Sequence, residues 1–99
     1  MEKFDKKMYA QALKYLSIRE YSELELYRKL QKKFVCNNSQ IIKGILDKLK
    51  GSNYLSDERF TSSKVKSLIN KKYGPNYIKL KMLNFGVDSK NTNSEIYKN

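Results

Sequence analysis

A capping signal at residue 22 constrains the fold of this chain more than any other feature. Ser22 is followed three residues later by Glu25, directly before a run of periodic apolar residues. In such a capping box the serine hydroxyl accepts from the Glu25 backbone N–H, and the Glu25 carboxylate accepts from the Ser22 N–H. The signal predicts that one helix ends and another begins within about three residues, so the two helices pack at a steep angle.

A second corner is predicted near residue 74. Gly74 stands at the cap and Pro75 at the first helical position, where the missing proline N–H costs nothing. Sliding the sequence by 52 residues places Tyr21 on Tyr73 and Ser22 on Gly74. The same offset pairs apolar residues on both sides of the corners: Met8 with Phe60, Leu13 with Val65, Leu16 with Leu68, Leu26 with Ile78, Leu30 with Met82, and Val35 with Val87. This pattern indicates a duplicated three-helix unit; the alternative is a chance match of two helical periods. Equivalent corners also lead us to expect that Tyr21 and Tyr73 both pack structurally.

Apolar residues recur at helical spacing through most of the chain. The expected helices are 6–19, 23–34, 40–50, 57–72, one that runs from Pro75 to a stop at Gly86, and a last one of a turn or two. No β-hairpin signal and no Gly-rich phosphate loop is present in the sequence. We therefore predict an all-α fold of tandem three-helix repeats, one complete (1–52) and one incomplete (53–99), with right-angled helix packing and a curved shape.

Local signals give finer expectations. Asp5, Ser56 and Thr92 are expected to cap helices, the polar break Asn37-Asn38-Ser39 offers capping residues for the third helix, and Gly51 is expected at the position just after that helix. In the fourth helix Val65, Leu68 and Ile69 are expected to be buried, with Phe60 at the rim. In the fifth, Ile78, Met82 and Phe85 form the inner face, whereas Leu80 and Leu83 form a second apolar edge. We expect this edge to be partly exposed, or covered by the 88–99 tail or by a partner; the alternative is that both leucines pack on a second side of the core.

Composition narrows the functional classes. A hydrophobic fraction of 39% over 99 residues suffices for one small domain, and no apolar run approaches the roughly 18 residues of a membrane span. The N-terminus carries no signal-peptide pattern and Cys36 is the single cysteine, so we expect a reducing, cytoplasmic setting. Without histidine, the sequence offers no metal cluster, no cofactor site and no nucleophile–base pair. We expect neither an enzyme nor a small-molecule substrate, and we interpret Cys36 as a packing residue.

The formal net charge of +11 indicates an anionic partner. Between Phe60 and Val87 every charged residue is a lysine, and a second basic group lies on the outer side of the second helix. The ten candidate contacts are Arg28, Lys29, Lys32, Lys33, Lys64, Lys66, Lys71, Lys72, Lys79 and Lys81. Lysines act as point charges, which favours non-specific phosphate or acidic-surface contact over base readout. The alternatives are compositional drift and solvated helix faces; Tyr73 and Tyr77 could stack on bases or simply pack.

The order of several short motifs resembles the RecX family of recombination regulators. The matching pieces are Ala12-Leu13-Lys14-Tyr15-Leu16, Arg19-Glu20-Tyr21-Ser22, Glu25-Leu26, Arg28-Lys29-Leu30, Leu49, Tyr54-Leu55, Asp57-Glu58-Arg59-Phe60 and Tyr73-Gly74-Pro75. They cover roughly residues 8–88. The resemblance implies a bacterial, all-helical, non-enzymatic protein that binds the RecA filament and its DNA and restrains recombination, with roles in DNA repair and the SOS response.

The sequence departs from the family pattern in length. The family normally carries a third three-helix repeat, and this sequence would lack it. We expect a monomer that binds the RecA nucleoprotein filament and modulates it, with inhibition the expected sign. The alternatives are a non-enzymatic nucleic-acid-binding helical module, because a three-helix unit with a sharp corner resembles a helix-turn-helix, and a generic helical interaction adapter.

Overall fold

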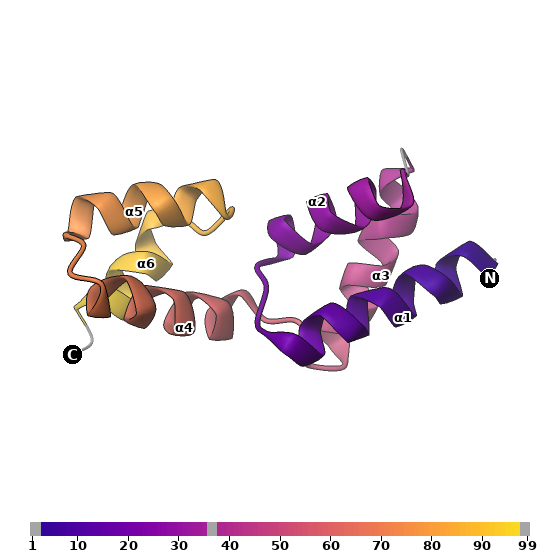
Figure 1. The fold of residues 1–99 in the computed structure, drawn as a ribbon, viewed down its shortest axis with the longest axis horizontal. Coiled ribbons are helices and arrows are strands. Elements are labelled where there is room, and N and C mark those ends of the chain that lie inside the picture. Colours follow the sequence, from indigo (N-terminus) through magenta and orange to yellow (C-terminus); the bar gives the residue numbers. More distant parts are fainter. Residues whose placement is uncertain (1–2, 36–37, 98–99) are drawn as a thin grey trace.

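Six helices follow one another along the chain in the computed structural model, which describes residues 3–35 and 38–97 (Figure 1). They are α1 (Lys3–Ile18), α2 (Glu23–Phe34), α3 (Ser39–Gly51), α4 (Asp57–Asn70), α5 (Pro75–Asn84) and α6 (Ser89–Ile96). The described residues contain no strand, so the all-α prediction is confirmed. Cys36, interpreted above as a packing residue, and Asn37 of the polar break lie outside the described residues.

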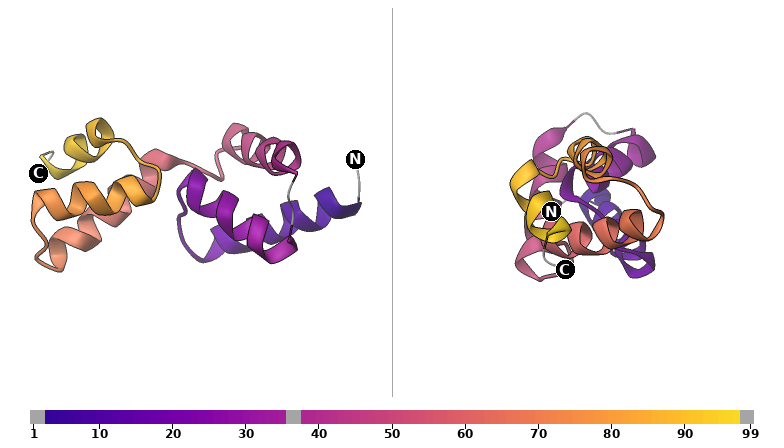
Figure 2. Two further views of the ribbon diagram at one scale, coloured as in Figure 1. Left: turned by 90° about the horizontal axis from the view of Figure 1, so that it is seen from above. Right: turned by 90° about the vertical axis from the view of Figure 1, so that its left-hand side faces the viewer.

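The helices form two groups of three that lie end to end. Helices α1–α3 pack together, α4–α6 pack together, and the molecule measures 44 × 23 × 21 Å (Figure 1). Figure 2 shows α3 and α6 along one long side, with α1, α2, α4 and α5 along the other. The latter four helices therefore share a continuous side of the molecule. That the groups are copies of each other, divided between residues 52 and 53, stays a prediction.

Each group has its own hydrophobic core. The buried members of the first core are Met8, Ala12, Tyr21, Leu26, Leu30, Ile42, Ile45, Leu46, Leu49 and Leu55. Those of the second are Phe60, Val65, Leu68, Ile78, Met82 and Val87. Leu55 belongs to the first core although it lies just before α4, so the connector is anchored on the first half.

The two corners form largely as predicted. Ser22 caps α2, and its Oγ accepts from the Glu25 N–H at 3.1 Å. The second half of the capping box is wrong: the Glu25 carboxylate pairs with Arg19 at 2.6 Å instead of with the Ser22 N–H. At the second corner Gly74 is the N-cap and Pro75 the first residue of α5.

At the other helix ends, some of the predicted capping positions are confirmed and others are wrong. Ser56 caps α4, accepting from the Arg59 N–H at 3.2 Å, and Asn38 caps α3. Asp5 lies inside α1, because that helix already includes Lys3. Gly51 is the last residue of α3 rather than the residue after it.

The last helix begins earlier than predicted. Asp88 is its N-cap, accepting from the Asn91 N–H at 2.8 Å, because aspartate fits that position at least as well as threonine. Thr92 is instead buried within α6, where its hydroxyl donates to the Asp88 carbonyl at 3.1 Å. The extra turn lets α6 pack against both α4 and α5.

Burial in α4 also differs from the prediction. Phe60 is 2% exposed rather than at the rim, since its ring packs edge-to-face on Phe85 at 5.2 Å and joins the second core. Ile69 is 38% exposed, because α5 and α6 cover the face of α4 that carries Val65 and Leu68. The exposed edge predicted for Leu80 and Leu83 is confirmed.

Polar contacts join the two halves. The Asp57 carboxylate accepts from the Glu23 N–H at 2.7 Å, so the first residue of α4 also caps α2. Arg59 donates to the Glu20 carboxylate at 3.0 Å. Arg28 of α2 donates to the Asn84 carbonyl at the end of α5, at 3.2 Å. These bonds hold α2 close to both α4 and α5 on the shared side.

Candidate functional site

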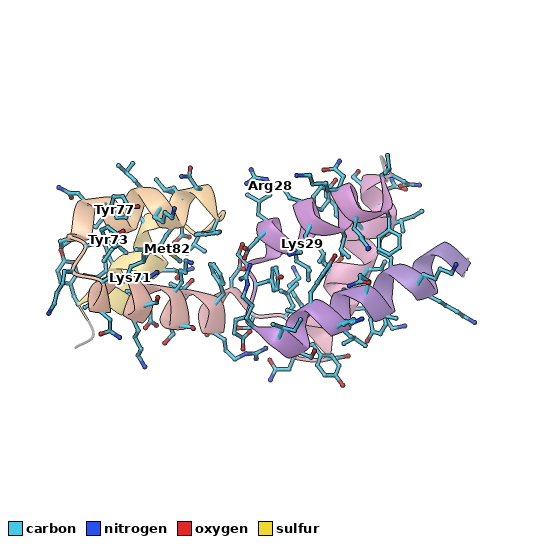
Figure 3. The ribbon with its side chains drawn as sticks, viewed as in Figure 1. Arg28, Lys29, Lys71, Tyr73, Tyr77 and Met82 are labelled. Atoms are coloured by element: carbon cyan, nitrogen blue, oxygen red, sulfur yellow. The ribbon has the colours of Figure 1, made fainter. Side chains whose placement is uncertain are left out.

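The side shared by α1, α2, α4 and α5 carries a chain of basic residues that we call the basic face. Its members are Arg19, Lys29, Lys64, Lys71 and Lys81. Aromatic rings lie beneath three of them, and electrostatic interaction links Lys64 to the other members of its half and to Arg19. In Figure 3 Lys29 lies between α1 and α2, and Lys71 lies on the side of α4 that faces α5.

The first half contributes a groove between α1 and α2. Tyr15 lines it together with the four predicted cations of α2: Arg28, Lys29, Lys32 and Lys33. The Lys29 ammonium lies 4.8 Å from the ring centroid of Tyr15 and 5.6 Å from that of Tyr21. All four cations are exposed, so the predicted cluster exists and remains accessible.

Arg19 fixes the centre of the face. Its guanidinium lies 3.7 Å from the Tyr21 ring centroid and binds the Glu25 carboxylate through both terminal nitrogens. The hydrogen bond to Glu25 raises the pKa of Arg19 above its usual value. Because Glu25 offsets this charge, Arg19 orders the Tyr21 ring more than it adds to the positive potential.

The second half contributes Lys64, which lies near enough to Lys71 and to Lys81 for their charges to act on it. Burial lowers the pKa of Lys64, and the positive charges of Arg19, Lys71 and Lys81 lower it further, against the opposing effect of Glu25. The Lys64 ammonium also lies 5.2 Å from the Phe85 ring. A bound anion would stabilise a partly desolvated cation of this kind, because the anion offsets the repulsion from the neighbouring positive charges.

A polar cleft opens where the halves meet. It is lined by Arg19, Glu20, Phe60, Ser63, Lys64 and Ser67. The hydroxyls of Ser63 and Ser67 stand beside Lys64 and can donate to phosphate oxygens. The sequence analysis missed both serines and Arg19. The spacing of Ser63 and Ser67, four residues apart and flanking Lys64, is the signal that would have found the serines.

Three predicted lysines lie away from this face. Lys66 lies two residues from Lys64 in α4, and Lys79 two residues from Lys81 in α5. Two residues correspond to a rotation of about 200° around the helix axis, so both side chains leave the helix on another side. The Lys79 ammonium lies 6.0 Å from the ring of Tyr97 instead. Lys72 lies in the α4–α5 corner with a left-handed φ of 71°.

The two corner tyrosines differ in their environment. Tyr21 is 4% exposed and belongs to the first core. Tyr73 is 43% exposed and stacks on Tyr77, with ring centroids 4.3 Å apart, at the outer end of the second half (Figure 3). Both rings pack against a neighbouring tyrosine as expected, Tyr21 against Tyr15 of α1 and Tyr73 against Tyr77 of α5, and the two corners differ only in how deeply the ring is buried.

The described part of the chain lacks two further kinds of feature. Among residues 3–35 and 38–97, no group of three or more Asp, Glu, Cys or His side chains could hold a metal ion. None of the described helices is long and apolar enough to cross a membrane.

The curated proteins named below, whose sequences are similar to this chain, are all RecX regulatory proteins. No protein-family model matches the sequence. The regulatory protein RecX of Streptococcus agalactiae is 35% identical over 85 residues, which are 85% of this chain and 32% of that protein. RecX of Herminiimonas arsenicoxydans is 40% identical over 65 residues (66% and 42%), and RecX of Legionella pneumophila 34% identical over 82 residues (83% and 53%).

A solved structure has the same fold. The crystal structure of a regulatory protein RecX aligns with a TM-score of 0.84 at 24% identity, over 96% of this chain and 46% of that one. The chain thus spans about a third to a half of the length of the curated relatives named above. Through these sequence matches, the chain belongs to the RecX family.

Proposed function

We propose that this chain binds the RecA nucleoprotein filament and inhibits its recombinase activity through the basic face. The observation that carries the proposal is the environment of Lys64, whose positive charge is partly desolvated and surrounded by Lys71, Lys81 and Arg19. Relatives named as regulatory proteins support the regulatory part of the proposal.

The chemistry of the face fits a polyanion without a fixed sequence. Lysines give point charges, and rings under the cations hold them in place without offering a pattern of base-edge donors and acceptors. A protein filament formed on DNA offers phosphates at regular intervals along its length. The basic face runs across both halves of the molecule, so a bound polyanion would contact several of its cations at once.

We place this function in the bacterial cytoplasm, with a single copy as the acting unit. A net charge of +11 disfavours association of two like chains at neutral pH. Regulation acts by occupancy of the filament, since the proposal gives the chain no catalytic step.

The test compares RecA-catalysed ATP hydrolysis and strand exchange with and without the chain. Lys64→Ala/Lys81→Ala removes one charge from α4 and one from α5 on the basic face. Lys66→Ala/Lys79→Ala removes the same charges from the same two helices on other sides. We expect the wild type and the control pair to inhibit, and the basic-face pair to lose at least ten-fold in potency. Equal loss by both pairs, or no inhibition by the wild type, contradicts the proposal.

A second candidate is a nucleic-acid-binding module that acts without RecA. The Lys29 ammonium over the half-buried ring of Tyr15 favours it, because that ring also lines the groove and a ring beside a cation can stack on bases of single strands. Binding to single-stranded DNA, duplex DNA and the RecA–DNA filament at one salt concentration separates the two. Preference for the filament supports the first candidate, and equal or tighter binding to naked DNA supports the second.

A further inference from the structure

One edge of α5 exposes apolar side chains in a continuous row. Leu80 is 64% exposed and Leu83 50%, and Tyr77 and Tyr73 are each 43% exposed. Tyr77, Leu80 and Leu83 follow at three-residue intervals, which keeps them on neighbouring positions of the helix surface. We call these four residues the α5 edge; Figure 3 shows its two tyrosines at the outer end of the molecule.

The α5 edge is separate from the face that α5 buries. Ile78 and Met82 are 1% and 0% exposed and belong to the second core, whereas no residue of the edge is among its members. The edge is also ordered in advance: Tyr73 and Tyr77 stack with ring centroids 4.3 Å apart. A rigid apolar row binds a partner with a smaller loss of side-chain entropy than a mobile one.

The internal offset shows that the apolar character is particular to α5. A shift of 52 residues places Leu80 opposite Arg28, Leu83 opposite Gln31, and Tyr77 opposite Glu25. The corresponding surface of α2 is therefore polar throughout. Three-helix packing alone does not call for leucines at these two positions.

Positive charge surrounds the edge. Lys79 lies four residues before Leu83, and Lys81 four residues after Tyr77, so each occupies a position next to the row on the helix surface. Lys72 directly precedes Tyr73. No acidic residue occurs between Phe60 and Val87, so the rim has a single sign of charge.

We propose that the α5 edge docks an acidic amphipathic helix of a partner protein. Leucine or phenylalanine side chains of that helix would cover the edge, and its flanking carboxylates would meet the lysines of the rim. Charge complementarity selects this occupant. A second copy would bring the same positive rim against itself, and a nucleic acid would leave Leu80 and Leu83 without stacking partners.

The probe for this inference is a synthetic amphipathic helix of about 18 residues with leucines at heptad spacing and glutamates beside them. We expect saturable binding by fluorescence anisotropy, with amide shift changes in the nuclear magnetic resonance spectrum centred on residues 73–83. A peptide with lysines in place of the glutamates should bind at least ten-fold more weakly. Equal binding of the two peptides, or shifts centred on α1 and α2, would overturn the inference.

Matched variants complete the test. Leu80→Ser/Leu83→Ser should weaken the acidic peptide at least ten-fold, whereas Ile18→Ser, at a site 76% exposed in the first half, should not. Circular dichroism and melting temperature check that each variant is folded. Sedimentation of the free chain and titration with single-stranded DNA cover the other occupants. Dimerisation lost in Leu80→Ser/Leu83→Ser, or DNA-induced shifts centred on Leu80, would refute peptide docking. Lys81 belongs both to the rim and to the basic face, but the leucine variants leave every member of the basic face in place, so their outcome is distinguishable from that of the RecA assays.

Discussion

Lys64 occupies a place where its charge costs stability. Its pKa is lowered by burial and by the neighbouring cations, so the folded chain holds the Lys64 proton less firmly than the unfolded chain does. Below the folded-state pKa the penalty is fully present, and stability recovers only as the pH rises through that pKa towards 10.5. The chain thus retains at neutral pH a residue that destabilises it, as binding sites commonly do.

Replacement of Lys64 should therefore separate stability from binding. We expect Lys64→Gln to raise the free energy of unfolding by up to about 0.5 kcal/mol, because the repulsion is removed, and to weaken polyanion binding several-fold. Urea unfolding and DNA titration measure the two effects. Lys66→Gln, which lies on another side of α4, is the control and should change neither. A destabilised Lys64→Gln would show that the desolvation argument is wrong.

Gly86 is the residue at which backbone conformation and packing act together. Its φ is 81°, and a Cβ built there would lie 2.9 Å from the Leu24 Cβ of α2. Both the left-handed conformation and the contact between halves require glycine.

We expect Gly86→Ala to lower the free energy of unfolding by about 2 kcal/mol or more, from backbone strain plus the forced shift of Leu24. Gly44→Ala is the control: an added Cβ meets nothing within 4 Å in the middle of α3, so we expect a gain of about 1 kcal/mol. Thermal or urea unfolding of both variants measures the difference. Similar effects of the two alanines would contradict the argument.

The sequence predicts residue burial well where one helix face is distinctly apolar. Leu26, Leu30 and Met82 are buried as expected, since each lies on the inner side of its helical period. Phe60 was misplaced at the rim because its burial depends on a contact from another element. Its ring is covered by that of Phe85. A contact between two helices cannot be inferred from the apolar period of either helix alone.

At the scale of helices, side-chain caps made the termini predictable. α2 begins and ends where the sequence indicates, since Ser22 defines its start, and α5 begins at Pro75. α6 was misplaced because two capping residues, Asp88 and Thr92, competed within four positions. Tertiary packing against α4 and α5 favours the longer helix, and it could not be read from the segment alone.

Asp57 connects helices of different halves, and no local signal predicted that role. Its carboxylate accepts from the Glu23 N–H, and partial burial raises its pKa, with Glu23 adding to the rise. The Glu23 N–H and Lys50 act in the opposite direction. A raised pKa means that the folded chain binds the proton more tightly, so ionised Asp57 costs stability at neutral pH.

We expect Asp57→Ala to destabilise the chain by about 1 kcal/mol through loss of the cap on α2. Asp57→Asn keeps an acceptor and should cost less at pH 7. Relative to Asp57→Asn, the wild type should gain stability as the pH falls through the Asp57 pKa towards 3.8. Urea unfolding between pH 4 and pH 7 measures this trend, and a relative loss of wild-type stability on acidification would reverse the conclusion.

For the molecule as a whole, the cation clusters could be predicted but not their arrangement. The ten candidate contact residues can be picked out from the sequence. Only the folded chain, however, separates Lys64, Lys71 and Lys81 on the basic face from Lys66 and Lys79 on other sides. The cleft between halves depends on how α1 meets α4, which no sequence period encodes. The exposure of Leu80 and Leu83 was predictable because it follows from helical spacing.

Salt dependence tests the basic face as a unit. Each phosphate contact on single-stranded DNA contributes about −0.7 to the slope of log affinity against log salt. We expect Lys64→Ala/Lys81→Ala to make the slope shallower by about 1.4, and Lys66→Ala/Lys79→Ala to leave it unchanged. Fluorescence titrations from low to moderate salt give the slopes. A flat dependence for the wild type would rule out an electrostatic interface.

The two hydrophobic cores differ in size, with ten buried members in the first and six in the second. Because polar bonds and few apolar contacts join them, the smaller unit can open while the larger one stays closed. Native-state hydrogen exchange should accordingly show α4–α6 exchanging through a subglobal transition, at a lower free energy than α1–α3. Polyanion added to the solution should slow that exchange by mass action, so the unit that carries most of the basic face would gain its full rigidity from its ligand.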